Sequence, residues 1–214
     1  PYWNGRFSNG PVWIEHISDS YGLSTTFGDA TAQGDNRAFG GSQTGQGYAY
    51  LTLPNVGTQI NNYLANVQSN FSNSDVIFLW AGGNDFLYGT GNPDVISQNM
   101  ASHVQALATA GATRFVVANL PPLELTPEGA SRSNQQQTTM ANDVILYNTK
   151  LSQEINNLSN SMNLEITLID AWSIFHQIVN NADHVGISNT QDQACTGGAT
   201  VPLVPLPICG SGAN

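Results

Sequence analysis

Two patterns of hydrophobic residues alternate along this chain. Short runs rich in Val, Ile, Leu and Phe occupy residues 76–80, 114–118 and 165–169, and each has the length of a strand buried in a parallel sheet. Between and after these runs, apolar residues recur three and four positions apart, which is the spacing of one helix face. Strands that alternate with helices predict an α/β fold with a doubly wound parallel sheet.

The helical spacing covers much of the remaining sequence. The predicted helices span residues 12–21, 58–71, 93–110, 140–162 and 172–179. Thr58 and Asp170 are the expected N-caps of the second and fifth helices, because their side-chain oxygens can accept backbone N–H bonds. Gly111 is expected to end the third helix as a C-cap. The residues expected to face inward from that third helix are Ile96, Met100, Val104 and Leu107.

One long segment lacks either pattern. Residues 22–47 are rich in Gly, Thr and Gln and predict a loop that holds one short strand near Asn36–Phe39. No change in composition divides the chain, and 214 residues suffice for one domain with a sizeable core. We therefore expect a single domain over residues 1–214.

The charge and hydropathy of the chain limit the classes of partner that it can bind. Charged residues make up only 9% of it, and five Lys and Arg stand against fifteen Asp and Glu, which gives a net charge of -10. Such a chain repels phosphate backbones, so we expect no nucleic-acid partner. No apolar run approaches the ~18 residues of a membrane span, and we expect no stable membrane insertion.

The two cysteines, Cys195 and Cys209, lie in a proline-rich tail without a clustered histidine. We therefore expect no metal and no other cofactor. A disulfide between them would contribute roughly 3 kcal/mol in the loop-entropy model. Together with the Lys-poor polar surface, the cysteine pair favours an extracellular protein.

The residues most suggestive of chemistry follow the first apolar run directly. Ala81-Gly82-Gly83-Asn84-Asp85 is a G-x-N-D motif at the carboxyl end of a predicted buried strand, where ligands of open α/β folds bind. The neutral Asn84 amide can donate a hydrogen bond to a developing oxyanion. By itself the motif is also compatible with an ordinary strand-to-loop turn.

Further segments resemble one family in the right order. Residues 1–13 contain the string G-R-F-S-N-G, residues 36–42 read N-R-A-F-G-G-S, and residues 119–122 read N-L-P-P. With the motif at 81–85 and the cysteine-bearing tail at 195–209, these segments resemble the GDSL-type (SGNH) ester hydrolases. The resemblance implies a flavodoxin-like, three-layer α/β/α fold with strand order 2-1-3-4-5.

The same resemblance assigns the candidate site residues. It implies that the Gly41 N–H and the Asn84 side chain are oxyanion donors. We expect Asp85 to hold the loop rather than to act on the substrate. The substrate is then a small-molecule or lipid ester, and we expect a monomer. Aromatic residues expected to line the substrate pocket are Trp3, Phe7, Tyr48 and Tyr50.

Two blocks of the family pattern do not occur in these 214 residues. The family's serine lies in a G-D-S-[LY] block upstream of G-R-F-S-N-G, and its Asp and His lie in a D-x-x-H-P block downstream of the cysteines. Gly28-Asp29-Ala30 lacks the hydroxyl, and Asp183-His184 lacks the spacing and the proline. We therefore expect a hydrolase domain truncated at both ends, with the first strand missing, poor folding and no activity in isolation.

The four histidines offer no obvious general base. His16, His103 and His176 fall within predicted helices, and His184 falls in a predicted loop. We expect His103, at the edge of an apolar stripe, to be a buried histidine with a hydrogen-bond partner. The alternative function is therefore a non-catalytic binding protein that keeps the scaffold and uses the groove beside Asn84.

Overall fold

The computed structural model describes residues 4, 6, 8, 10–27, 35–66, 71–190 and 192. The chain divides into two compact units, one formed by residues 1–40 and 192–214 and the other by residues 41–191. The expectation of a single domain stays a prediction. The candidate site residues Gly41 and Asn84 both belong to the second unit.

The first unit contains helix α1 (Trp13–Ser20), as predicted. The Arg6 guanidinium donates to both carboxylate oxygens of Glu15, and the Val12 N–H donates to Glu15 Oε2 at 2.8 Å. These hydrogen bonds, those from Arg6 foremost, lower the pKa of Glu15 to about 2. The ion pair therefore fixes the chain that enters α1.

The predicted strand at Asn36–Phe39 is wrong. Only an isolated parallel bridge joins Asn36 to Phe27. The Ala38 N–H donates to the Asn36 side-chain oxygen at 3.1 Å, which forms a local turn and withdraws that N–H from a ladder.

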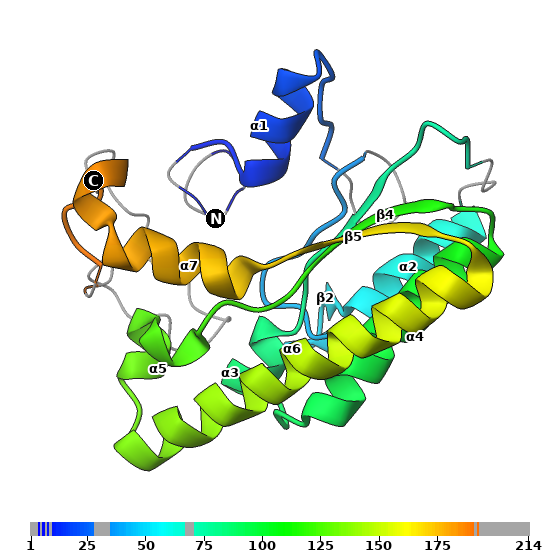
Figure 1. The fold of residues 1–214 in the computed structure, drawn as a ribbon. Coiled ribbons are helices and arrows are strands. Elements are labelled where there is room, and N and C mark those ends of the chain that lie inside the picture. The colour runs from blue at the N-terminus through cyan, green and yellow to red at the C-terminus, as the bar shows by residue number, and fades with distance from the viewer. Residues whose placement is uncertain are drawn as a thin grey trace. The chain divides into compact units, whose positions relative to one another are not determined.

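The second unit is built on a parallel sheet of three strands (Figure 1). Its strands are β3 (Ile77–Leu79), β4 (Arg114–Ala118) and β5 (Glu165–Ile169). Their spatial order is β3-β4-β5, with Phe78 opposite Val116 and Val116 opposite Thr167. This confirms the α/β class, and the order agrees with the 3-4-5 part of the expected arrangement.

Two long helices form the crossover connections, α4 (Pro93–Thr109) and α6 (Asn134–Met162). They lie side by side below the strands in Figure 1, and Lys150 Nζ joins Asp94 Oδ1 across them at 2.6 Å. The predicted stripe on α4 is buried, so the helical spacing identified this core face correctly. The core residues of α4, β4 and α6 are Ile96, Met100, Val104, Leu107, Phe115, Val117, Met140, Val144, Tyr147, Leu151 and Ile155.

Helix ends are fixed by polar side chains. Asn92 caps α4 by accepting from Asp94 N, and Ser133 forms a capping box with Gln136 at the start of α6. Gly111 follows α4 with a φ of +110°, the left-handed conformation expected for a helix stop. Asp170 caps α7 (Ala171–Asn180), as predicted.

The remaining elements among the described residues are one helix of 11 residues and six segments of two to six residues. They are β1 (Tyr48–Ala49), β2 (Leu53–Pro54), α2 (Val56–Asn66), α3 (Gly83–Tyr88), η1 (Leu123–Leu125), α5 (Pro127–Ala130) and η2 (Ala182–Val185). The antiparallel β1–β2 hairpin and α3 were not predicted. The prediction of Thr58 as an N-cap is wrong: it lies within α2, and its hydroxyl bonds both the N–H and the C=O of Gly47.

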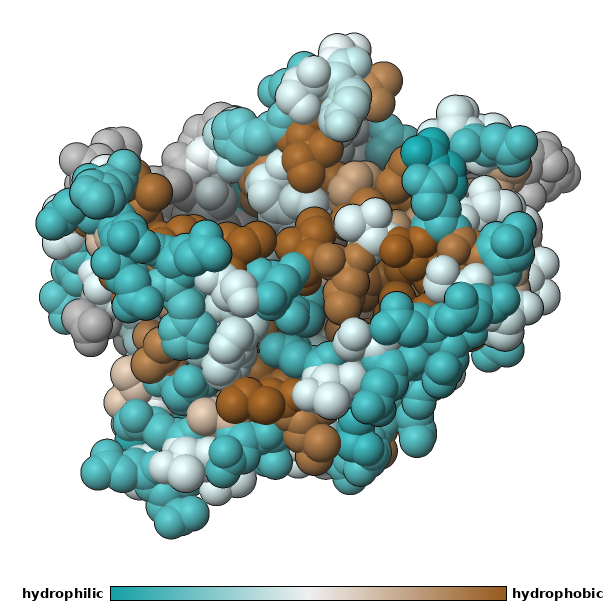
Figure 2. Space-filling view, viewed as in Figure 1, coloured by the Kyte–Doolittle hydropathy of each residue, from teal (hydrophilic) through white to brown (hydrophobic). Residues whose placement is uncertain are grey.

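The hydropathy of the exposed surface differs between the two halves of α6. In Figure 2, hydrophilic residues cover most of its second half, and hydrophobic surface appears over part of its first half. Ile145 and Leu146 are exposed on that half. No helix within the described ranges is both long and apolar enough to cross a lipid bilayer.

Tyr147 anchors the end of β3 to the core, and its loss gives a test of the fold. Its ring is fully buried, and its hydroxyl donates to the Ala81 carbonyl at 3.2 Å. We expect Tyr147→Phe to lower the free energy of unfolding by about 1–3 kcal/mol, because the Ala81 carbonyl loses its partner. Urea unfolding measures this change. Tyr21→Phe, at a side chain that is 78% exposed, is the control, and an equal effect in both variants would contradict the anchoring role.

Candidate functional site

A glycine turns the chain sharply where β3 leads into α3. Gly82 has a φ of +114°, and a Cβ placed there would lie 3.3–3.4 Å from Ile96, Leu120 and Tyr147. Only glycine meets both conditions without strain. The turn starts α3 at Gly83, so Asn84 falls in the first turn of this helix.

Asn84 reaches across to the loop that follows Gly41. Its side-chain Nδ2 donates to the Ser42 carbonyl oxygen at 3.0 Å. An amide NH₂ carries two hydrogens, so one remains available for a second acceptor. The structure therefore brings the two predicted donors together, with Asn84 bound to the residue directly after Gly41.

Gly41 has a backbone conformation that suits glycine. Its φ is +89°, and an added Cβ would lie 3.3 Å from Leu53 Cδ1 and 3.5 Å from Tyr50 Cε2. Within the part of the chain that the structure describes, the Gly41 N–H makes no hydrogen bond. The backbone at Gly41 therefore combines a left-handed φ with an N–H that has no partner in the described part of the chain.

Thr44 ties the loop to the G-x-N-D motif. Asp85 accepts from the Thr44 N–H at 3.0 and 3.1 Å and from the Thr44 hydroxyl at 2.7 Å. Both residues are buried. The expectation that Asp85 holds the loop is therefore confirmed.

Helix α4 completes the polar contacts of Thr44. Asn99 Nδ2 donates to the Thr44 hydroxyl at 3.0 Å, and His103 Nε2 lies 2.7 Å from the Thr44 carbonyl oxygen. The N–H, the hydroxyl and the C=O of Thr44 are thus all bonded. The carbonyl can only accept, so His103 carries its proton on Nε2. His103 is a buried histidine with a partner, as predicted.

Burial governs the ionisation of this cluster. It raises the pKa of Asp85, although the hydrogen bonds from Thr44 act in the opposite direction. It lowers the pKa of His103, although the contact with the Thr44 carbonyl opposes this shift. Burial, followed by the charge of Asp85, raises the pKa of Tyr147.

The N-L-P-P segment is fixed at the carboxyl end of β4. Asn119 donates from Nδ2 to Asp170 Oδ1 at 3.0 Å and accepts from the Trp172 N–H at 3.1 Å. Its carbonyl accepts from the Trp80 indole at 3.0 Å. These bonds connect the ends of all three strands, and they make Asp170 a structural residue, as expected.

The aromatic residues predicted to line the substrate pocket, and the two cysteines, lie either outside the described residues or in the β1–β2 hairpin. Trp3, Phe7, Cys195 and Cys209 lie outside the described residues. Tyr48 belongs to β1 and Tyr50 to the turn of the hairpin.

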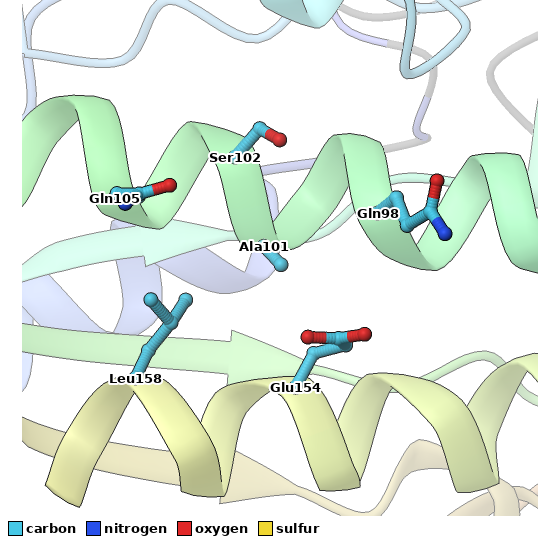
Figure 3. Close-up of a pocket in the computed structure, with 6 residues that line it drawn as sticks. All are labelled: Gln98, Ala101, Ser102, Gln105, Glu154 and Leu158. Carbon is cyan, nitrogen blue, oxygen red and sulfur yellow. The ribbon is translucent and has the colours of Figure 1, made fainter. Parts of the chain in front are cut away.

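A separate groove of about 270 Å³ lies between α4 and α6 (Figure 3). It contains none of the predicted site residues. Its lining consists of Gln98, Ala101, Ser102, Gln105, Glu154 and Leu158.

Thr44, Asn99 and His103 were missed as parts of the site. One signal could have found two of them: Asn99 and His103 are four residues apart on α4, and therefore neighbours beside its buried stripe. Two polar residues in that position require a buried polar partner. Thr44 itself lies in a loop without a periodic pattern.

Comparison with models of protein families shows which family the chain belongs to. The model of the family described as GDSL-like lipase/acylhydrolase matches residues 1–191. The chain belongs to this family. The recognition made from G-R-F-S-N-G and the shorter blocks is therefore confirmed, and so is the α/β fold class.

Individual relatives support the same family. The chain is similar to a phosphatidylcholine-sterol acyltransferase of Aeromonas hydrophila, with 26% identity over 207 residues, covering 94% of the chain and 58% of the relative. It is 28% identical over 193 residues to a thermolabile hemolysin of Vibrio parahaemolyticus, covering 88% of the chain and 43% of the relative. A GDSL esterase/lipase of Arabidopsis thaliana is 23% identical over 233 residues, covering 89% and 64%.

The chain spans about half the length of the first two of these relatives. Membership of the GDSL family supports action on ester bonds, by hydrolysis or acyl transfer in general.

The lowered pKa of His103 predicts a pH dependence of stability. An unfolded histidine binds a proton near pH 6.5, whereas the folded His103 binds its proton only at a lower pH. As the pH falls below about 6.5, the unfolded state binds more protons, so the free energy of unfolding should decrease. His103→Gln keeps a donor for the Thr44 carbonyl and should reduce this decrease.

Urea unfolding between pH 7.5 and 5 measures the effect. His184→Gln, at an exposed position, is the matched control. Equal pH dependence in wild type and His103→Gln would exclude His103 as the source.

The left-handed backbone of Gly41 predicts a cost for any side chain. We expect Gly41→Ala to lower the free energy of unfolding by about 1–2 kcal/mol, because of the positive φ and the close Leu53 side chain. Gly45→Ala is the control in the same loop, since an added Cβ there meets nothing closer than 4.0 Å. Chemical unfolding compares the two, and equal midpoints would contradict the assignment.

Proposed function

We propose that the protein containing these 214 residues cleaves carboxylic esters by a serine-dependent reaction. The Gly41 N–H and the Asn84 Nδ2–H serve as oxyanion donors in this reaction. The observation that carries the proposal is the hydrogen bond from Asn84 Nδ2 to the Ser42 carbonyl. It supports a site in which the two donors act on one oxygen atom.

In this reaction a serine Oγ attacks the ester carbonyl carbon and loses its proton to a histidine. The C=O bond becomes a C–O⁻ single bond, and the two donors stabilise the negative oxygen. Collapse of the tetrahedral intermediate breaks the bond to the alcohol, which leaves with the proton from the histidine. Water then hydrolyses the acyl-enzyme, whereas an acceptor alcohol in its place gives acyl transfer.

The rigidity of the donors supports this role. Stabilisation of an oxyanion requires dipoles that are already oriented before charge develops. Asn84 lies in the first turn of α3 and is held through Ser42, and Thr44 holds the loop two residues further along. Little reorganisation is then needed when the oxyanion forms.

The serine and the Asp–His pair are proposed to come from parts of the whole protein other than these 214 residues. His103 supports this view, because its Nε2 faces the Thr44 carbonyl within the core. His176 packs against Trp172 with ring centroids 5.2 Å apart. The 214-residue chain alone is therefore expected to be inactive.

The substrate is proposed to be a small-molecule or lipid ester bound by a monomer. A lipid ester is favoured by the names of the relatives, one of which is a phosphatidylcholine-sterol acyltransferase. Export is proposed from the Cys195–Cys209 pair and the low Lys content, and a thiol count on the unreduced protein tests it.

The alternative proposal is a binding protein that keeps the scaffold without catalysis. It is motivated by the absence of the G-D-S and D-x-x-H-P blocks from these 214 residues. Covalent labelling by a fluorophosphonate distinguishes the proposals, because only an activated serine reacts. Labelling of the whole protein would rule out the binding-only alternative.

The role of Asn84 is tested in the whole protein with p-nitrophenyl butyrate. We expect Asn84→Ala to lower kcat by about 10²–10³, because one oxyanion donor is lost. Asn142→Ala, on the exposed face of α6, is the control and should keep full turnover. A KM increase without a change in kcat would contradict the oxyanion role.

A further inference from the structure

The β1–β2 hairpin has an apolar tip that the proposed reaction does not use. Three residues, Tyr50, Leu51 and Thr52, connect its paired strands. Leu51 is 85% exposed, and Tyr48 and Tyr50 are exposed as well. Exposed apolar side chains gathered at one turn suggest a contact surface.

The backbone of this tip adopts a conformation that bulky residues rarely take. Tyr50 has a φ of +51° and Leu51 a φ of +71°. Glycine, asparagine or aspartate is usual in such turns. Large side chains at both positions cost some stability, and a function of these side chains is one reason for such strain.

The base of the hairpin is held firmly. Thr58 bonds both polar backbone groups of Gly47, and Asn55 accepts from the Gln43 N–H and donates to the Gln46 carbonyl. These side chains fix the strands on either side of the tip. The exposed tip is therefore carried by strands whose bases are fixed.

The hairpin is directly connected to the proposed oxyanion donor. A Cβ added to Gly41 would lie 3.5 Å from the Tyr50 ring and 3.3 Å from Leu53. Of the tip residues, Tyr50 therefore lies next to the Gly41 backbone.

The distribution of charge along the chain indicates which kind of surface the hairpin tip can contact. The chain has a net charge of -10, but residues 38–74 include no Asp, Glu, Lys, Arg or His. The hairpin lies in the middle of this uncharged stretch. The acidic chain as a whole is repelled by an anionic surface, whereas the uncharged tip can enter an electrically neutral one.

We propose that the β1–β2 hairpin tip inserts Leu51, flanked by Tyr48 and Tyr50, into a zwitterionic lipid surface. The insertion brings an aggregated lipid ester to the donor at Gly41. This inference rests on the proposed ester hydrolysis for its purpose, but the lipid contact is measurable by itself. Leucine supplies hydrocarbon contact, and tyrosines suit the boundary between headgroups and acyl chains.

The test measures binding of the purified protein to vesicles of ether-linked phosphatidylcholine, which contains no ester to cleave. Flotation gives the bound fraction. We expect wild-type protein to bind these vesicles and to bind vesicles containing ether-linked phosphatidylglycerol less. Leu51→Ser should lower the partition constant about tenfold, since most of one leucine side chain no longer enters hydrocarbon.

Two further variants separate the proposal from general effects. Leu146→Ser removes a leucine that is exposed on α6, and it should change binding less than twofold. Leu51→Gly should raise the unfolding temperature, because glycine relieves the left-handed backbone, while binding still falls. A stability gain combined with a binding loss cannot result from misfolding.

Absence of wild-type binding, equal losses in Leu51→Ser and Leu146→Ser, or preference for the anionic vesicles would overturn the inference. A soluble ester assay keeps the two proposals apart. Hydrolysis of p-nitrophenyl acetate without vesicle binding would remove the hairpin proposal alone. Vesicle binding by the whole protein without any hydrolysis would remove the proposed function alone.

Discussion

The site depends on one buried contact, between the Asp85 carboxylate and Thr44. Asp85 belongs to the motif at the end of β3, and Thr44 belongs to a loop about forty residues earlier. Their hydrogen bonds join the first residues of the second unit to the end of β3 and so close the segment between Thr44 and Asp85. The position of Ser42 relative to Asn84, and hence of Gly41 relative to Asn84, follows from this closure. A threonine uses the contact fully, because its hydroxyl both donates to Asp85 and accepts from Asn99.

In this charge-poor protein, side-chain amides and hydroxyls make many of the hydrogen bonds that hold distant segments together. Asn55, Asn119 and Asn148 each bond backbone groups of distant segments. Such bonds require no counter-charge, and a buried amide is satisfied by peptide groups alone. The result is a scaffold in which loops are fixed by short polar side chains at strand ends. This explains how a protein with 9% charged residues orders its loops.

The sequence predicted the periodic parts of the fold. Burial of Ile96, Met100 and Val104 follows from their helical spacing, and the three strands lie within the predicted apolar runs. Fully buried residues are found on β4, whereas β3 and β5 are only partly buried. The pairing of Gly41 with Asn84 came from the resemblance to a family. The hairpin tip was not predictable, because Tyr50 and Leu51 adopt a backbone that their types disfavour. The strand expected at residues 36–39 failed because Asn36 forms a local turn with Ala38.

The hydrogen bonds around Asn119 have a mechanical consequence. Trp80 at the end of β3 donates to the carbonyl at the end of β4, and the Asn119 side chain continues to Asp170 at the end of β5. The three strand ends are therefore joined in series through Asn119, and moving one end away from its neighbour breaks a side-chain hydrogen bond in addition to the bonds of the sheet. Any change of shape at this edge of the sheet must then come from the loops beyond the strand ends, because the strand ends themselves are tied to one another.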